Sequence, residues 1–192
     1  MEKFELKDTR SGFGEGLLEL GKENSDVVAL CADLTGSLKM DAFEKKFASF
    51  HGKNFQAVGV ANGTDAIALC LRGLGLGTGD EVITPSHTAV ATVAGIEQAG
   101  CTPVFADIDP NTRCISPKSI EKRVGTNTRA IMPVHIYGQP AEMQRILDIA
   151  NVHNLAVIED CSQAHGAEIQ GQKVGTFAYF SAYSCYPTKN LG

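Results

Sequence analysis

The sequence has 192 residues, of which 43% are hydrophobic and 20% charged, with 20 Gly, 6 Cys and no Trp. This composition is typical of a globular protein and excludes the collagen, coiled-coil and disordered classes. The 17 basic and 22 acidic side chains give a net charge of −5, which argues against a nucleic-acid partner. We expect no membrane partner and a cytoplasmic location, because the sequence shows neither a long apolar run nor a secretory signal.

The cysteines and histidines do not form metal-binding patterns. The six cysteines are scattered and include no C-x-x-C pair, and the five histidines form neither H-x-x-x-H nor H-E-x-x-H. Zinc sites need such closely spaced pairs. We therefore expect no metal site and interpret the cysteines as reduced packing residues.

The predicted elements begin with a helix over 14–22, a strand over 27–32 and a charged helix over 41–50. From residue 56 onward, short β-branched runs alternate with helical stretches. This alternation is typical of a parallel α/β sheet. Strands are predicted over 56–60, 81–84, 102–108, 130–136, 156–160 and 179–184. Helices are predicted over 64–74, 88–99, 117–124 and 141–153.

The repeated strand–helix steps favour a mainly parallel, doubly wound open sheet, because parallel strands require right-handed crossover connections. Ligands of such sheets bind at the carboxyl ends of the strands. Candidate functional residues are therefore sought where the predicted strands end.

The first candidate is Asn62-Gly63-Thr64, between a strand and an apolar helix. Backbone N–H groups, the threonine hydroxyl and the helix dipole would converge there on an anion such as a phosphate. Two simpler interpretations are a plain N-cap and a β-hairpin turn. Dinucleotide and P-loop sites are not indicated, because neither G-x-G-x-x-G nor G-x-x-x-x-G-K-[ST] occurs.

The second candidate is the end of the strand over 156–160, where Glu159 and Asp160 follow apolar residues and Gln163 comes shortly after. A carboxylate at this place needs a cation or a hydrogen-bond donor. A ring-nitrogen cation of a cofactor would serve. The alternative is a carboxylate that caps the next helix or pairs with a lysine.

The third candidate is Lys189, which follows Ser184 and the strand-breaking Tyr186-Pro187 pair. A lysine beside an anion site at a strand exit can become a nucleophilic amine when its pKa is lowered. An isolated lysine is more often a solvated surface group. The combination of all three candidates favours the interpretation of Lys189 as a reactive amine over that of a surface group.

Residues 43–192 closely resemble the DegT/DnrJ/EryC1/StrS family of sugar aminotransferases, which depend on pyridoxal 5'-phosphate (PLP). The resemblance covers about three quarters of the chain. It implies the large domain of the fold-type-I PLP-dependent transferases. The matching stretches are VANGTDAIALCLRGLGLGTGDEVITPSHTAVATVAGIE, PVFADIDPNTRCISPKSIE, AIMPVHIYGQPAEM, VIEDCSQAHGA and YPTKNLG.

The resemblance assigns roles to the candidate residues. It implies that Lys189 is the catalytic lysine that forms a Schiff base with the cofactor and then acts as a general base. Asp160 would pair with the pyridinium nitrogen, which makes the ring an electron sink. Gly63, Thr64 and Ser184 would bind the cofactor phosphate.

Two further residues are implied to contact the cofactor ring. Gln163 would contact the ring face or its hydroxyl. Relatives often carry a stacked aromatic residue where this chain has Ala89, so His87 becomes the candidate for stacking. Tyr179 is another departure, because an acidic residue commonly stands there.

The resemblance implies transamination of a nucleotide-linked keto sugar with an amino acid donor such as glutamate, by a homodimer. The chain stops at Gly192, three residues after Lys189. We therefore expect a truncated domain that lacks part of its substrate pocket.

Residues 9–43 resemble the start of the pyrimidine-binding region of transketolases. We accordingly divide the chain into a transketolase-like segment, 1–43, and the first half of an aminotransferase large domain, 44–192, joined as a chimera. Two alternative functions remain open, a thiamine-diphosphate-dependent transketolase subunit and a non-catalytic fragment. Thiamine chemistry is disfavoured because no glutamate follows Gly59-Val60-Ala61.

Overall fold

The structure is a computed structural model that describes residues 27–31 and 40–190. The helix predicted over 14–22 lies outside these ranges. Within them, no helix is long and apolar enough to cross a membrane.

A seven-stranded sheet forms the centre of the molecule, and every neighbouring pair of strands is parallel. The strand order is β2-β1-β9-β6-β5-β3-β4. The strands are β1 (Val27–Cys31), β2 (Gln56–Val60), β3 (Glu81–Pro85), β4 (Thr102–Ala106), β5 (Thr128–Ile131), β6 (Ala156–Asp160) and β9 (Phe180–Tyr183). The predicted parallel α/β sheet is confirmed.

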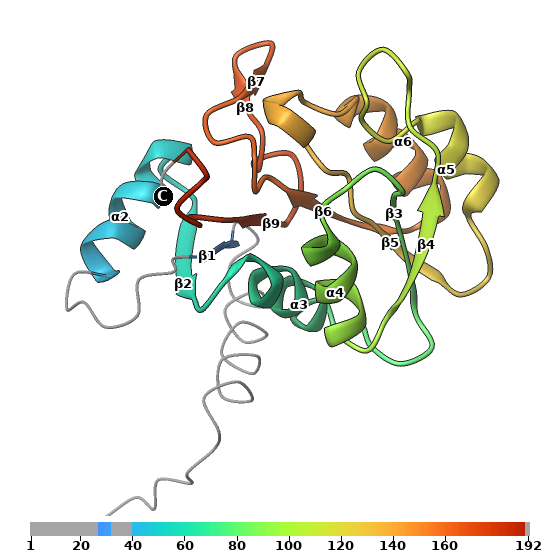
Figure 1. Ribbon diagram of the computed structural model, residues 1–192, viewed down its shortest axis with the longest axis horizontal. Coiled ribbons are helices and arrows are strands. Elements are labelled where there is room, and N and C mark those ends of the chain that lie inside the picture. Colours follow the sequence, from blue (N-terminus) through green and yellow to red (C-terminus); the bar gives the residue numbers. More distant parts are fainter. Residues whose placement is uncertain (1–26, 32–39, 191–192) are drawn as a thin grey trace, which may run out of the picture.

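Helices connect the strands and cover the sheet, as Figure 1 shows. In that view α3 and α4 lie together below the strands, α2 lies beside β2 at one end of the sheet, and α5 lies beside β4 at the other. The helices are α2 (Met40–His51), α3 (Gly63–Gly73), α4 (Val90–Gln98), α5 (Pro117–Arg123) and α6 (Met143–His153).

The central strands bury both faces, because successive side chains point to opposite sides of a strand. In β3, Val82 belongs to the apolar cluster on the side of α3 and α4, whereas Ile83 belongs to the cluster on the side of α5 and α6. In β6, Ile158 and Val157 divide in the same way. This two-sided burial explains why these strands read as continuous apolar runs.

The prediction of one strand over 130–136 is wrong in its bounds. Strand β5 spans Thr128–Ile131 and is followed by an isolated bridge between Val134 and Asp160. Pro133 interrupts the ladder because it has no N–H to donate, although its carbonyl accepts from Asp160 N at 2.9 Å. The chain then forms a short 3-10 turn, Ile136–Gly138. This interruption opens a loop at the carboxyl edge of the sheet.

The structure also differs from the predictions at the end of β4 and in a hairpin outside the main sheet. The strand predicted over 102–108 ends at Ala106. Two short strands that the sequence did not predict, β7 (Glu168–Ile169) and β8 (Gln172–Lys173), pair as an antiparallel hairpin outside the main sheet. Strands of two residues carry too little periodicity to be recognised in a sequence.

Strand β1 comes from the segment that was predicted to be transketolase-like. It lies between β2 and β9 and pairs with both, so the described part of this segment belongs to the main sheet. Its transketolase-like origin and the domain division at residue 43 stay predictions.

Helices α3 and α4 approach each other most closely at Gly95. A Cβ at this position would lie 2.7 Å from Ile67 Cγ2 and 2.9 Å from the carbonyl oxygen of Thr64. We expect Gly95→Ala to lower the free energy of unfolding by about 2 kcal/mol, because the overlap outweighs the gain in helix propensity. Urea denaturation measures this. Gly77→Ala, whose Cβ would meet nothing closer than 3.8 Å, is the control, and equal midpoints for the two variants would contradict the close approach.

Candidate active site

A pocket of about 340 Å³ lies at the carboxyl ends of the strands. Its walls come from the segments that follow β2, β3, β5, β6 and β9, which is the edge where ligands of parallel sheets bind. Six of the seven predicted site residues line it together, namely Gly63, Thr64, Asp160, Gln163, Ser184 and Lys189.

Asp160 supplies a buried carboxylate to the pocket wall and is 3% exposed. Thr92 Oγ1 donates to Oδ2 at 2.8 Å, and the backbone N–H of Ser162 donates to Oδ1 at 3.1 Å. Among the described residues, no Lys, Arg or His forms an ion pair with this carboxylate. The pocket therefore presents a negative charge that a bound cation would complement.

The start of α3 contrasts with the Asp160 carboxylate, because it offers the pocket hydrogen-bond donors and the positive end of a helix dipole. Asn62 is the N-cap, and its Oδ1 accepts from Asp65 N at 2.8 Å. Asn62 therefore caps the helix and the hairpin alternative is wrong, while the binding of a phosphate at this helix start stays a prediction. The remaining N–H groups of a first helical turn point outward without intrahelical partners and favour an anion.

Ser184 lies against this helix start. A Cβ added to Gly63 would lie 3.3 Å from Ser184 Cβ and 3.6 Å from its Oγ, so glycine allows the hydroxyl to approach the helix start closely. Thr64 lines the same part of the pocket. Two hydroxyls and a helix N-terminus thus converge, which suits a phosphate group.

Lys189 enters the pocket from the segment after β9. Its backbone N–H donates to the carbonyl of Tyr186 at 2.7 Å, which closes a turn around Pro187. The side chain is half-buried. A primary amine, a buried carboxylate and an anion-binding helix start therefore share one pocket.

Gln163 has a fixed orientation. Its Oε1 accepts from the backbone N–H of Tyr137 at 2.8 Å. The amide NH₂ is therefore the end that can donate to a ligand in the pocket.

His87 is the predicted site residue that does not line the pocket, although its neighbours Thr88 and Ala89 do, and its stacking on the cofactor stays a prediction. It lies against Tyr137. The two rings are 5.7 Å apart between centroids, and His87 Nε2 is 3.2 Å from the hydroxyl of Tyr137. Sequence reasoning missed Tyr137, since nothing in its local pattern indicates this contact. It also missed Thr92, whose position one turn beyond Thr88 on a largely apolar helix was an available signal.

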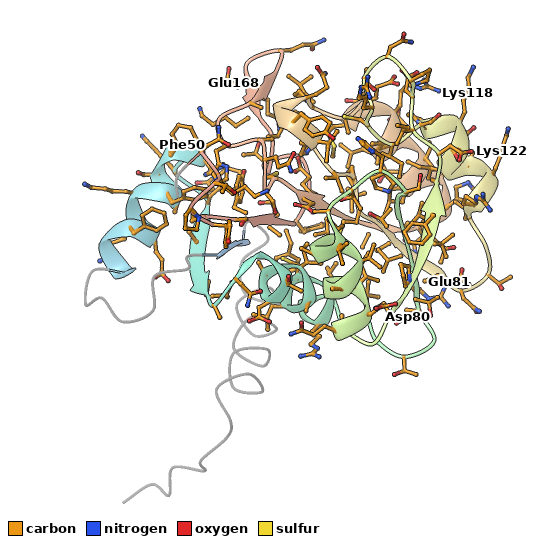
Figure 2. All side chains as sticks on the ribbon, viewed as in Figure 1. Phe50, Asp80, Glu81, Lys118, Lys122 and Glu168 are labelled. Atoms are coloured by element: carbon orange, nitrogen blue, oxygen red, sulfur yellow. The ribbon has the colours of Figure 1, made fainter. Side chains whose placement is uncertain are left out.

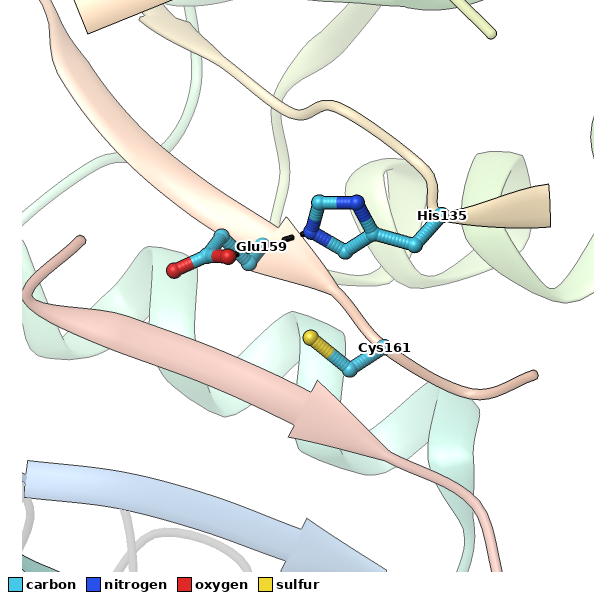
Figure 3. A group of neighbouring side chains, drawn as sticks. All are labelled: His135, Glu159 and Cys161. Atoms are coloured by element: carbon cyan, nitrogen blue, oxygen red, sulfur yellow. Dashed lines mark hydrogen bonds and ion pairs between the residues drawn. The ribbon is translucent and has the colours of Figure 1, made fainter. Parts of the chain in front are cut away.

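A second polar cluster lies behind the pocket, around Glu159, which has no exposed surface. The Glu159 carboxylate accepts from the backbone N–H groups of Gly175, Phe177 and Ala178 at 2.7, 2.8 and 3.0 Å. It also lies 3.0 Å from His135 Nε2 (Figure 3). A buried carboxylate was predicted to need hydrogen-bond donors, and for Glu159 these are backbone N–H groups and the His135 imidazole.

His135, Glu159 and Cys161 have potential metal-ligand atoms within 4.8 Å of one another. His135 Nδ1 accepts from the backbone N–H of Ala141 at 3.0 Å, which leaves Nε2 as the donor to Glu159. Burial, reinforced by the charge of Glu159, raises the pKa of the Cys161 thiol. A metal ion would have to displace these hydrogen bonds, so we interpret the cluster as structural.

Comparison with known families identifies the chain. Residues 25–192 match the DegT/DnrJ/EryC1/StrS aminotransferase family. The chain belongs to this family. The match begins before the predicted boundary at residue 43 and includes strand β1.

Curated relatives within the DegT/DnrJ/EryC1/StrS family include several nucleotide-sugar transaminases. The chain is 43% identical over 154 residues to dTDP-3-amino-3,4,6-trideoxy-alpha-D-glucose transaminase of Streptomyces venezuelae, covering 80% of this chain and 40% of the relative. It is 48% identical over 146 residues to dTDP-3-amino-3,6-dideoxy-alpha-D-galactopyranose transaminase of Aneurinibacillus thermoaerophilus, covering 76% and 40%. The chain thus matches less than half the length of these relatives.

Solved structures of related proteins show the same fold. The chain matches DesV of S. venezuelae, solved in complex with a ketimine intermediate, with a TM-score of 0.77 and 36% identity, over 95% of this chain and 47% of that one. It matches NtdA of Bacillus subtilis, solved with the cofactor PMP, with a TM-score of 0.77 and 33% identity, over 97% and 40%. The fold is that of the PLP-dependent fold-type-I aminotransferases, represented by part of the domain.

Proposed function

We propose that the chain is the cofactor-binding part of a PLP-dependent sugar aminotransferase, which transfers an amino group from a donor such as glutamate to a nucleotide-linked keto sugar. The observation that carries this proposal is the convergence of Gly63, Thr64, Asp160, Gln163, Ser184 and Lys189 on one pocket. The names of the relatives, which are transaminases of dTDP- and UDP-linked sugars, support the substrate class.

The pocket fits PLP at both ends of that molecule. Asp160 offers a buried carboxylate that would hold the proton on the ring nitrogen. Gly63, Thr64 and Ser184 offer a helix start and hydroxyls that would hold the phosphate. When bound, PLP supplies an electron sink for the carbanion formed at the donor carbon.

Gln163 would bind the ring hydroxyl of the cofactor, and Lys189 would accept the transferred proton. The Gln163 amide, held by Tyr137 N–H, would donate to the oxygen on the ring. Lys189 would hold the cofactor covalently through Nζ, and its amine would serve as the base for the proton at the donor Cα. A homodimer and a cytoplasmic location stay predictions.

Covalent labelling tests this proposal. Incubation with PLP followed by borohydride is expected to attach the cofactor to the peptide that contains Lys189, as peptide mass mapping would show. Lysines on the outer surface of α5, such as Lys118 and Lys122 in Figure 2, are the internal comparison. A label spread evenly over these lysines and Lys189 would contradict the assignment.

A further inference from the structure

An aromatic pair, Tyr137 and His87, lies beside the pocket, and the proposed cofactor binding gives the Tyr137 ring no role. Tyr137 comes from the loop after β5, and His87 comes from the loop after β3. Strands β3 and β5 are neighbours in the sheet, so the pair bridges two loops at its carboxyl edge. Ile136 and Thr88, which adjoin the two residues in the sequence, line the pocket itself, and this places the pair at its rim.

The backbone of Tyr137 is held in an unfavourable conformation. Its φ of 56° and ψ of 21° lie in the left-handed region, which costs energy for a residue with a Cβ and is rare for an aromatic one. Such strain concentrates at functional sites, where the surrounding structure maintains it. Glycine would fit this backbone better, so the side chain at this position needs another explanation.

The Tyr137 side chain is also 67% exposed, although hydrogen bonds hold the residue at both ends. The backbone N–H donates to Gln163, and the hydroxyl meets His87 Nε2 at 3.2 Å. Packing in the core therefore does not explain why an aromatic residue stands at position 137. An oriented aromatic face that remains accessible provides contact area at low cost in side-chain entropy.

The size of the pocket points to what this ring contacts. At about 340 Å³, the pocket is near the lower limit for small-molecule sites. A bound cofactor would fill its inner part and leave the reacting substrate at the mouth, beside Tyr137. A pyranose ring presents C–H groups on its faces and hydroxyls at its edge. The C–H groups match the aromatic face of Tyr137, and the sugar hydroxyls match the Tyr137 hydroxyl and the His87 imidazole.

We propose that Tyr137, oriented by His87, forms the wall on which the sugar ring of the nucleotide-linked substrate packs. This inference rests on the proposed function and adds a specificity-determining pair to it. Because the backbone N–H of Tyr137 orients Gln163, the same turn would align the cofactor-facing amide with the sugar-facing ring.

Calorimetric titration of the cofactor-loaded chain tests this inference, with dTDP-glucose as the probe. Tyr137→Ala keeps the backbone donor to Gln163 and is expected to weaken dTDP-glucose binding about tenfold. Tyr137→Phe keeps the ring and is expected to weaken it about twofold. Tyr137→Gly is expected to raise the urea midpoint, because glycine accepts the left-handed backbone, while losing as much affinity as Tyr137→Ala. If Tyr137 had only a structural role, its replacement would lower the urea midpoint and the affinity for dTDP-glucose together.

Two comparisons separate this inference from the proposed function. Affinity for dTDP, which lacks the sugar, is expected to be equal in wild type and Tyr137→Ala; an equal loss for both probes would overturn the sugar assignment. Absent saturable binding by the wild type, or unchanged binding by Tyr137→Ala, would also overturn it. If PLP labelling of Lys189 fails in the wild type, the proposed function fails first; if labelling succeeds and the titrations do not differ, only this inference fails.

Discussion

Replacing Lys189 by alanine is expected to abolish covalent labelling of the chain by PLP and borohydride. The reason is that Lys189 contributes an amine to the pocket that also contains Asp160 and Ser184, so the variant keeps the groups that would hold the ring and phosphate but has no Nζ there to bond. Labelling is measured by intact mass after reduction. The residual adduct is expected to fall below about one tenth of that of the wild type, because surface amines are protonated near neutral pH and react poorly.

Lys122→Ala is the matched control, since Lys122 is exposed on α5. We expect it to label like the wild type. The urea midpoint of Lys189→Ala is expected to stay close to that of the wild type, because the lost side chain is only half-buried. Full labelling of Lys189→Ala, with an unchanged midpoint, would refute the role of Lys189.

The strand bounds were predicted correctly where the local sequence itself determines where the strand ends. The bounds predicted for 56–60 and 156–160 coincide with β2 and β6, because apolar β-branched runs end there at polar or helix-starting residues. The prediction failed over 130–136, where Pro133 interrupts a run whose hydrophobicity continues to Ile136. The strand order was not predictable in detail, because it depends on pairings between segments far apart in the sequence.

The site was predictable to the extent that its residues follow strand ends. Gly63, Asp160 and Ser184 each stand where a strand finishes, and parallel strands bring those ends to one edge. Thr92 and Tyr137 contact the other site residues through side-chain and backbone hydrogen bonds over separations of 68 and 26 residues. The partners in such contacts cannot be read from a sequence, even where, as for Thr92 one turn beyond Thr88, the position of a polar residue is a signal.

Glu159 and Asp160 show how the fold separates two similar residues. Successive side chains of β6 point to opposite faces of the sheet, so Asp160 faces the pocket and Glu159 faces the layer behind it. Glu159 has four hydrogen-bond partners, which match the four lone-pair sites of a carboxylate. Asp160 has two, which leaves capacity for a ligand. The free hydrogen-bonding capacity of Asp160 supports its proposed ligand-binding role, whereas Glu159, whose partners are all within the protein, has a structural role.

Replacing Glu159 by glutamine is expected to lower the free energy of unfolding by about 3 kcal/mol. Glutamine has nearly the same volume, but its NH₂ group would face donors that now share the carboxylate oxygens. On one side these are the N–H groups of Phe177 and Ala178, and on the other they are Gly175 N–H and His135 Nε2. Flipping the amide only moves the conflict, and Ala141 N–H prevents His135 from exchanging tautomers. Urea denaturation followed by circular dichroism measures the effect.

Glu168→Gln is the control for this prediction. Glu168 is on the surface hairpin, where its side chain is 45% exposed and lies 3.5 Å from Lys173 Nζ (Figure 2). An exposed ion pair contributes at most about 1 kcal/mol, so this variant is expected to unfold close to the wild type. If Glu159→Gln were as stable as Glu168→Gln, the four bonds to Glu159 would not hold the segment before β9 in place. The segment carrying Ser184 and Lys189 would then depend on other contacts for its position.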